Sequence, residues 1–123
     1  MRTILVVDDN PEAARELQTQ LESTGRFLVV CAHNGPAALN LARSAPPDLV
    51  LCNVEMPGMD GGSLACAMQE EPVLQKLPLI FLSSLISPQE NATRPTLGRW
   101  PIVSKQSAFE IIVRRIDAVL ARV

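Results

Sequence analysis

Hydrophobic residues in this chain occur in short continuous runs that alternate with longer amphipathic segments. The first run, Ile4–Val7, is rich in β-branched residues and ends at two aspartates, which is typical of a strand buried on both faces of a parallel sheet. Four further runs of similar character follow along the chain. Together they predict strands at 4–7, 27–32, 48–53, 79–82 and 102–104.

Each predicted strand is followed by a segment with helical signals, and capping residues indicate where several helices begin. Asn10 precedes a proline at the first helical position, and Asp60 is placed to cap the third helix. Ser107 with Glu110 predicts a capping box at the last helix, which carries an apolar stripe. Five such strand–helix units imply an α/β fold, with a parallel sheet covered by helices on both faces.

Size and composition narrow the class of protein. A chain of 123 residues and 13.4 kDa is expected to form a single domain over 1–123. Its three cysteines, Cys31, Cys52 and Cys66, lie in apolar runs without metal-site spacing, so we expect buried thiols in a reducing cytoplasm. A formal net charge of -2 without a Lys/Arg cluster disfavours nucleic-acid binding. No apolar run has the length of a membrane span, and cytoplasmic localisation is expected.

Polar residues stand at the carboxyl ends of four predicted strands. Asp8 and Asp9 follow the first strand, Asn53 ends the third, Ser83 follows the fourth and Lys105 follows the fifth. Ligand sites of open parallel sheets lie at this edge, so these side chains are expected to converge on one crevice. Paired carboxylates suit Mg²⁺, and a hydroxyl with an ammonium group suits phosphate oxygens. The pattern indicates phosphoryl chemistry, although an acid pair alone is also common as a helix cap.

Four segments of the chain together resemble the receiver domain of two-component response regulators, the CheY-like superfamily. These segments are Val6–Asp9, Asp48–Gly61, Pro78–Ser84 and Val103–Lys105, and the resemblance spans essentially the whole chain. It implies a doubly wound, flavodoxin-like (βα)5 fold with parallel strand order 2-1-3-4-5. It also implies a non-enzymatic module of a two-component or phosphorelay system, which accepts a phosphoryl group from a histidine kinase or phosphotransfer protein.

The resemblance also assigns metal ligands. Asp9 corresponds to the direct Mg²⁺ ligand, Asp8 to its support, and the carbonyl of Glu55 to a further ligand. The side chain at position 53 corresponds to the phospho-acceptor and completes the metal site. This position holds Asn53, so three carboxylates become two, and we expect Mg²⁺ binding to be weakened.

The same resemblance makes Ser83 the switch hydroxyl and pairs Lys105 with a phosphoryl oxygen. The neutral amide of Asn53 is not a usable nucleophile for forming an acyl phosphate, so this chain is not expected to be phosphorylated. It can instead donate a hydrogen bond to Asp8 or Asp9. Two hypotheses follow. In the first, Asn53 is native and the chain is a pseudo-receiver that works by binding. In the second, Asn53 replaces the acceptor of a phosphorylatable receiver.

Further departures from the family concern the region that contacts partners. Pro95 predicts a fourth helix that is short and ends before it, and Gln106 stands where the family usually has proline, so a trans bond is expected there. The resemblance implies that an output domain or effector binds the face of helix 4, strand 5 and helix 5, and Trp100 is a candidate contact. The alternative, a small flavodoxin-like enzyme or nucleotide binder, is disfavoured because no glycine-rich loop follows the first strand.

Overall fold

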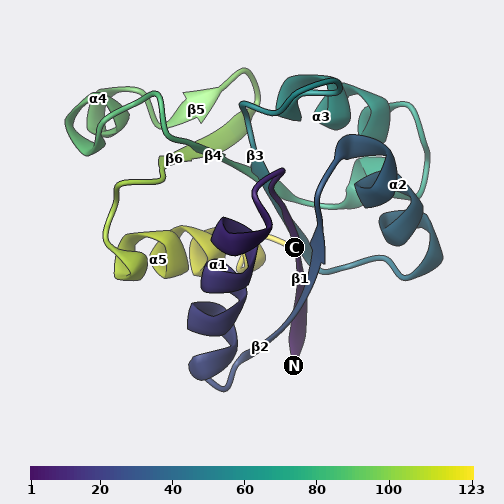
Figure 1. The fold of residues 1–123 in the computed structure, drawn as a ribbon, viewed down its shortest axis with the longest axis horizontal. Helices are drawn as coiled ribbons and strands as arrows, with labels where there is room; N and C mark the ends of the chain where they lie inside the picture. The colour runs from purple at the N-terminus through teal and green to yellow at the C-terminus, as the bar shows by residue number, and fades with distance from the viewer.

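Six strands form the central sheet of the computed structural model, which describes residues 1–123 (Figure 1). Their order across the sheet is β2-β1-β3-β4-β6-β5. All neighbouring pairs are parallel except β5 and β6, which are antiparallel. The strands are β1 (Arg2–Val7), β2 (Phe27–Ala32), β3 (Leu49–Asn53), β4 (Leu79–Ser83), β5 (Thr96–Leu97) and β6 (Trp100–Ser104).

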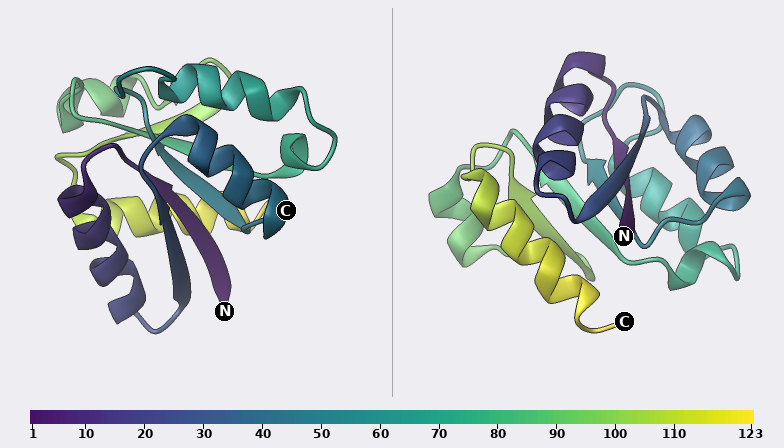
Figure 2. Two further views of the ribbon diagram at one scale, coloured as in Figure 1. Left: turned by 45° about the vertical axis from the view of Figure 1, so that its right-hand side comes forward. Right: turned by 90° about the horizontal axis from the view of Figure 1, so that it is seen from below.

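Helices cover both faces of this sheet, which gives the α/β, flavodoxin-like architecture that the sequence predicts. Figures 1 and 2 show α1 and α5 on one face and α2 and α3 on the other, with α4 beside β5 and β6. The helices are α1 (Pro11–Ser23), α2 (Gly35–Ser44), α3 (Gly61–Gln69), α4 (Pro88–Thr93) and α5 (Phe109–Leu120), and a 3-10 turn spans Leu74–Lys76. None of the helices has the length and apolar character needed to span a bilayer.

Two apolar clusters, one on each face of the sheet, hold the layers together. Alternate residues of a strand point to opposite faces, so β1 contributes to both. Ile4 and Val6 pack in the cluster that α1 and α5 complete, whereas Leu5 and Val7 pack in the cluster that α2 and α3 complete. All four side chains are essentially inaccessible to solvent. Burial on both faces explains why this strand is continuously apolar.

The region before the last strand differs from the prediction. The expected strand 5 is β6, and it is not at the edge of the sheet, because β5 pairs with it as a short antiparallel hairpin. Pro95 ends the helical segment, Gly98 adopts a positive φ of 60° at the turn, and the Ile102 N–H donates to the Pro95 carbonyl. A strand of two residues is too short to show a pattern of alternating hydrophobic and polar residues, so the sequence did not predict it.

Three local predictions have different outcomes. α4 is short and begins with a complete Ser87 capping box, as expected, and no peptide bond is cis. The capping box predicted at Ser107 is wrong, because α5 begins at Phe109 and its N-cap is Ala108 without a side-chain hydrogen bond. Burial of all three thiols is also wrong, since Cys66 lies on the exposed side of α3.

Candidate functional site

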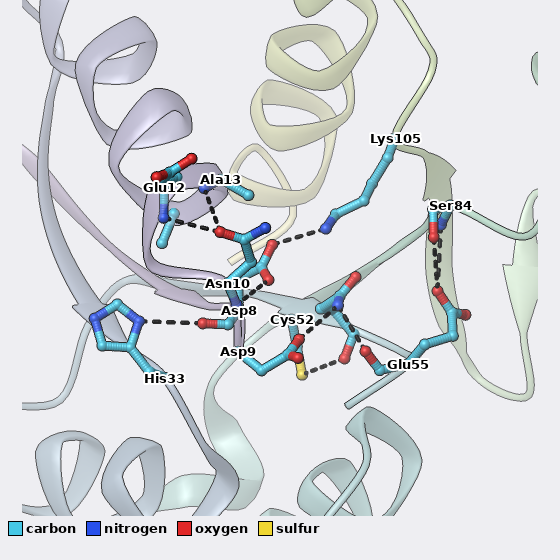
Figure 3. Close-up of polar contacts among 12 residues, drawn as sticks. Asp8, Asp9, Asn10, Glu12, Ala13, His33, Cys52, Glu55, Ser84 and Lys105 are labelled. Atoms are coloured by element: carbon cyan, nitrogen blue, oxygen red, sulfur yellow. Dashed lines mark hydrogen bonds and ion pairs between the residues drawn. The ribbon is translucent and has the colours of Figure 1, made fainter. Parts of the chain in front are cut away.

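Six side chains gather at the carboxyl edge of the sheet, and we call them the strand-end cluster. Parallel strands end at the same edge, so residues distant in sequence meet there (Figure 3). The structure therefore brings together every residue that the sequence placed in the crevice. The cluster comprises Asp8, Asp9, Asn53, Glu55, Ser83 and Lys105.

Asp8 is the most buried carboxylate of the cluster. One of its oxygens accepts from the Lys105 ammonium at 2.7 Å, and the other accepts from the backbone N–H of Asn10 at 2.9 Å. The Asp8 side chain is 8% exposed and that of Lys105 27%, so this ion pair is partly desolvated. Removing either partner would leave a buried charge without compensation. His33 is exposed, and its Nδ1 lies 3.1 Å from the Asp8 carbonyl oxygen.

Asn53 lies at the centre of the cluster and is 6% exposed. Its Nδ2 donates to the backbone carbonyl of Glu55 at 2.8 Å and reaches Asp9 Oδ1 at 3.5 Å. The reverse orientation would bring the amide oxygen against two other oxygens, so these contacts fix which way the amide points. Asn53 Oδ1 is buried and has no hydrogen-bond partner.

Glu55 has a second role that its sequence position did not indicate. Its carboxylate accepts from the Ser83 hydroxyl at 2.8 Å and from the backbone N–H of Ser84 at 3.2 Å. Figure 3 shows the Glu55 side chain directed at Ser84, away from Asp8 and Lys105. The resemblance assigns a role only to the Glu55 carbonyl, so this side-chain contact was missed.

Comparisons with known proteins agree with this geometry. The family model for the response regulator receiver domain matches residues 4–117. The chain belongs to this family. Protein PilH of Pseudomonas aeruginosa is 30% identical over 121 residues, which cover 98% of this chain and 99% of PilH. The chain spans about half the length of several other curated relatives that it matches.

Two solved structures place the fold in the same family. The receiver domain of a signal transduction histidine kinase from Syntrophus aciditrophicus has a TM-score of 0.84 at 28% identity, covering 100% of this chain and 92% of that one. The response regulator TrrA of Thermotoga maritima, solved in complex with Mg²⁺ and BeF, has a TM-score of 0.80 at 28% identity, covering 97% and 99%. The receiver fold is therefore shown independently of the site chemistry.

The Mg²⁺ that receiver domains typically bind does not fit the cluster as it is arranged here. Asp8 and Asp9 supply hard oxygen donors, but no third acidic, histidine or cysteine side chain joins them. Asn53 directs its amide N–H at Asp9 and at the Glu55 carbonyl, and its free oxygen therefore faces away from both. An ion held by these groups would require the Asn53 amide to turn over.

Residues around the cluster explain how β3 and α3 approach so closely. A Cβ on Gly61 would lie 2.5 Å from the Asn53 carbonyl oxygen, so only glycine fits at this position. The Gly61 N–H donates to the Val54 carbonyl and ties the loop to the start of α3. Burial raises the pKa of the Cys52 thiol to about 12, with smaller contributions from the Asp60 and Asp8 carboxylates, so this neighbour of Asn53 stays protonated at neutral pH.

Asn91 is a second structural contact that sequence reasoning missed. Its side-chain amide donates to the Ile102 carbonyl at 2.8 Å and accepts from the Ser104 N–H at 3.0 Å, in the manner of a neighbouring strand. The Ser104 hydroxyl donates to the Ile86 carbonyl at 2.7 Å. α4, which buries none of its own residues, is thereby attached to β6.

Proposed function

We propose that this receiver domain acts by binding a partner protein and is not phosphorylated at position 53. The observation that carries the proposal is the orientation of Asn53, whose Nδ2 donates to the Glu55 carbonyl at 2.8 Å. An amide offers no nucleophilic carboxylate oxygen, and here it also satisfies groups that the resemblance assigns to the metal. The domain is a signalling module and not an enzyme.

A second candidate is a receiver whose natural acceptor has been replaced by Asn53. The placement of the other residues favours it, since Asp8, Asp9, Ser83 and Lys105 all lie at the same sheet edge. In this case Asp at position 53 would accept a phosphoryl group from a histidine kinase or phosphotransfer protein. The Ser83 hydroxyl and Lys105 would then contact the phosphoryl oxygens.

Intact mass spectrometry separates these candidates. The parent chain, Asn53→Asp and the matched control Asn40→Asp are incubated with Mg²⁺ and a small-molecule phosphodonor. We expect no phosphoryl adduct on the parent or on Asn40→Asp, because neither has a carboxylate at position 53. An adduct on the parent chain would contradict the proposal. An adduct on Asn53→Asp alone supports the second candidate, whereas no adduct on a folded Asn53→Asp supports the native pseudo-receiver.

We further propose that Mg²⁺ binds more weakly than in a receiver with three acidic residues. The ion would rely on Asp8 and Asp9 and would have to displace the Asn53 amide from the Glu55 carbonyl. Isothermal titration should give a Kd for Mg²⁺ that is larger for the parent chain than for Asn53→Asp. Equal dissociation constants would show that Asn53 does not compete with the ion.

The partner surface in this proposal is the face of α4, β6 and α5, with no role for nucleic acid or membrane. Trp100 is half-buried, and its ring meets that of Phe81 edge to face at 5.7 Å. It also borders a groove of about 740 Å³ between α3 and the β5–β6 hairpin. Trp100→Ala should weaken affinity for an output domain or effector. Unchanged affinity and unchanged self-association would remove Trp100 from the interface.

A further inference from the structure

The Glu55 carboxylate is held by hydrogen-bond donors and not by a cation. The Ser83 hydroxyl and the Ser84 N–H each donate to one of its oxygens, at 2.8 and 3.2 Å, and the Ser84 hydroxyl lies 3.5 Å from the second oxygen. The one ammonium of the strand-end cluster, Lys105, pairs with Asp8 instead. A hydroxyl and a backbone N–H that converge on one carboxylate form a binding site for an oxyanion.

The Ser83 hydroxyl both donates and accepts a hydrogen bond in this arrangement. It donates to Glu55 and accepts from the Leu85 N–H at 3.1 Å, so its rotation is fixed from both sides. Ser83 is 2% exposed, which means that water does not offer an alternative partner. The loop from β4 to α4 is therefore fastened at its first residues by Glu55.

The far end of the same loop is fastened as well. The Ile86 carbonyl accepts from the Ser104 hydroxyl at 2.7 Å. The Ser87 hydroxyl accepts from the Glu90 N–H at 3.1 Å, while the Glu90 carboxylate accepts from the Ser87 N–H. Contacts within the chain therefore hold this loop at both of its ends.

We propose that the Glu55 carboxylate is a resident ligand of the Ser83 hydroxyl and the Ser84 N–H, at the place where a receiver domain binds the oxygens of its phosphoryl group. The tethered carboxylate holds the β4–α4 loop in one conformation and excludes inorganic oxyanions. This inference rests on the proposed function, because it concerns a receiver that is not phosphorylated. It adds a regulatory role for Glu55, which would act as an internal ligand of the switch hydroxyl.

Amide hydrogen exchange, measured by NMR without Mg²⁺ or phosphodonor, tests the loop-ordering role. In Glu55→Ala the Ser84 N–H should exchange about tenfold faster than in the parent chain, because its charged acceptor is lost. The backbone carbonyl that receives the Asn53 amide stays in place in this variant. Glu90→Ala is the matched control, since it removes a carboxylate from the first turn of α4, next to this loop, but leaves the Ser84 acceptor intact. Unchanged Ser84 exchange in Glu55→Ala would overturn the proposal.

Inorganic phosphate then tests whether the site takes an oxyanion. At constant ionic strength, phosphate should shift the Ser84 amide resonance of Glu55→Ala and leave that of the parent chain in place. Glu55→Gln, a conservative replacement that keeps the side-chain length, should give a smaller shift than Glu55→Ala. The additional change Ser83→Ala should abolish the response.

A parent chain that responds as strongly as Glu55→Ala, or a folded Glu55→Ala that does not respond, would refute the oxyanion site. These measurements involve no chemistry at Asn53. Phosphorylation of the parent chain would therefore contradict the proposed function and leave the test of Glu55 standing.

Discussion

Asn53→Asp should make the stability of this receiver domain depend on Mg²⁺. The substitution replaces Nδ2, which donates to the Glu55 carbonyl and faces Asp9 Oδ1, by a carboxylate oxygen of nearly the same position. Two hydrogen-bond contacts are lost, and a second negative charge arises beside Asp9. Lys105 offers limited relief, because its ammonium is already engaged by Asp8 at 2.7 Å.

The size of the effect follows from the distance between these groups. Two unit charges 3.5 Å apart repel by about 5 kcal/mol at an effective dielectric constant of about 20. Asp9 is exposed, so solvent screening reduces this repulsion, and we expect the free energy of unfolding to fall by about 2 to 3 kcal/mol. Mg²⁺ at about 100 times its Kd would restore about 2.7 kcal/mol.

Urea denaturation followed by circular dichroism measures this effect with EDTA and again with Mg²⁺. The parent chain should unfold at the same urea concentration in both conditions. Asn53→Asp should be less stable with EDTA and should recover with Mg²⁺, while Asn40→Asp on the surface of α2 should show neither change. If Mg²⁺ stabilises the parent chain as much as Asn53→Asp, the competition between the Asn53 amide and the ion is refuted.

Three further predictions concern stability and thiol chemistry. Asn91→Ala should lower the free energy of unfolding by about 1 to 3 kcal/mol in urea denaturation, because the Ile102 carbonyl and Ser104 N–H lose their partner; a loss within experimental error would show that α4 is held by other contacts. The Cys52 pKa rises from 9.0 to about 12 on folding, so at a pH between these two values the folded state binds more protons than the unfolded state. The free energy of unfolding should therefore fall as the pH rises above about 9. Cys52→Ala should remove that part of the pH dependence. Cys66, which is exposed, should be the first thiol alkylated in the native state, whereas Cys52 should react only on unfolding; early modification of Cys52 on peptide mapping would contradict its burial.

Much of the fold could be predicted because its strands are buried on both faces. Runs such as Ile4–Val7 have no polar residue to face solvent, and Asn10 and Asp60 cap their helices as expected. The predictions that were wrong concern short-range geometry. β5 has two residues, too few for a periodic pattern, and a shift of the α5 start to Phe109 left Ser107 outside the cap.

The site was predictable as far as topology determines it. Parallel strands end at one edge, so Asp8, Asn53, Ser83 and Lys105 had to lie near one another once the strands were recognised. Side-chain direction on the loops was not predictable in the same way. Whether the Glu55 carboxylate faces solvent or Ser83 depends on the path of the β3–α3 loop, which no periodicity reports.

The strand-end cluster has the formal charge that it would have with an acidic residue at position 53 and a neutral residue at position 55. In this chain the two are exchanged, with the neutral Asn53 and the acidic Glu55. Asp8, Asp9 and Glu55 against Lys105 sum to -2, but one negative charge lies at the Ser83 hydroxyl and not at the end of β3. The position of that charge decides whether the Ser83 hydroxyl and the Ser84 N–H are free to donate hydrogen bonds to a phosphoryl group. Asn53→Asp with Glu55→Asn should therefore be phosphorylated faster than Asn53→Asp alone in a mass-spectrometric time course. Equal rates would mean that Glu55 does not compete with the phosphoryl group for these donors.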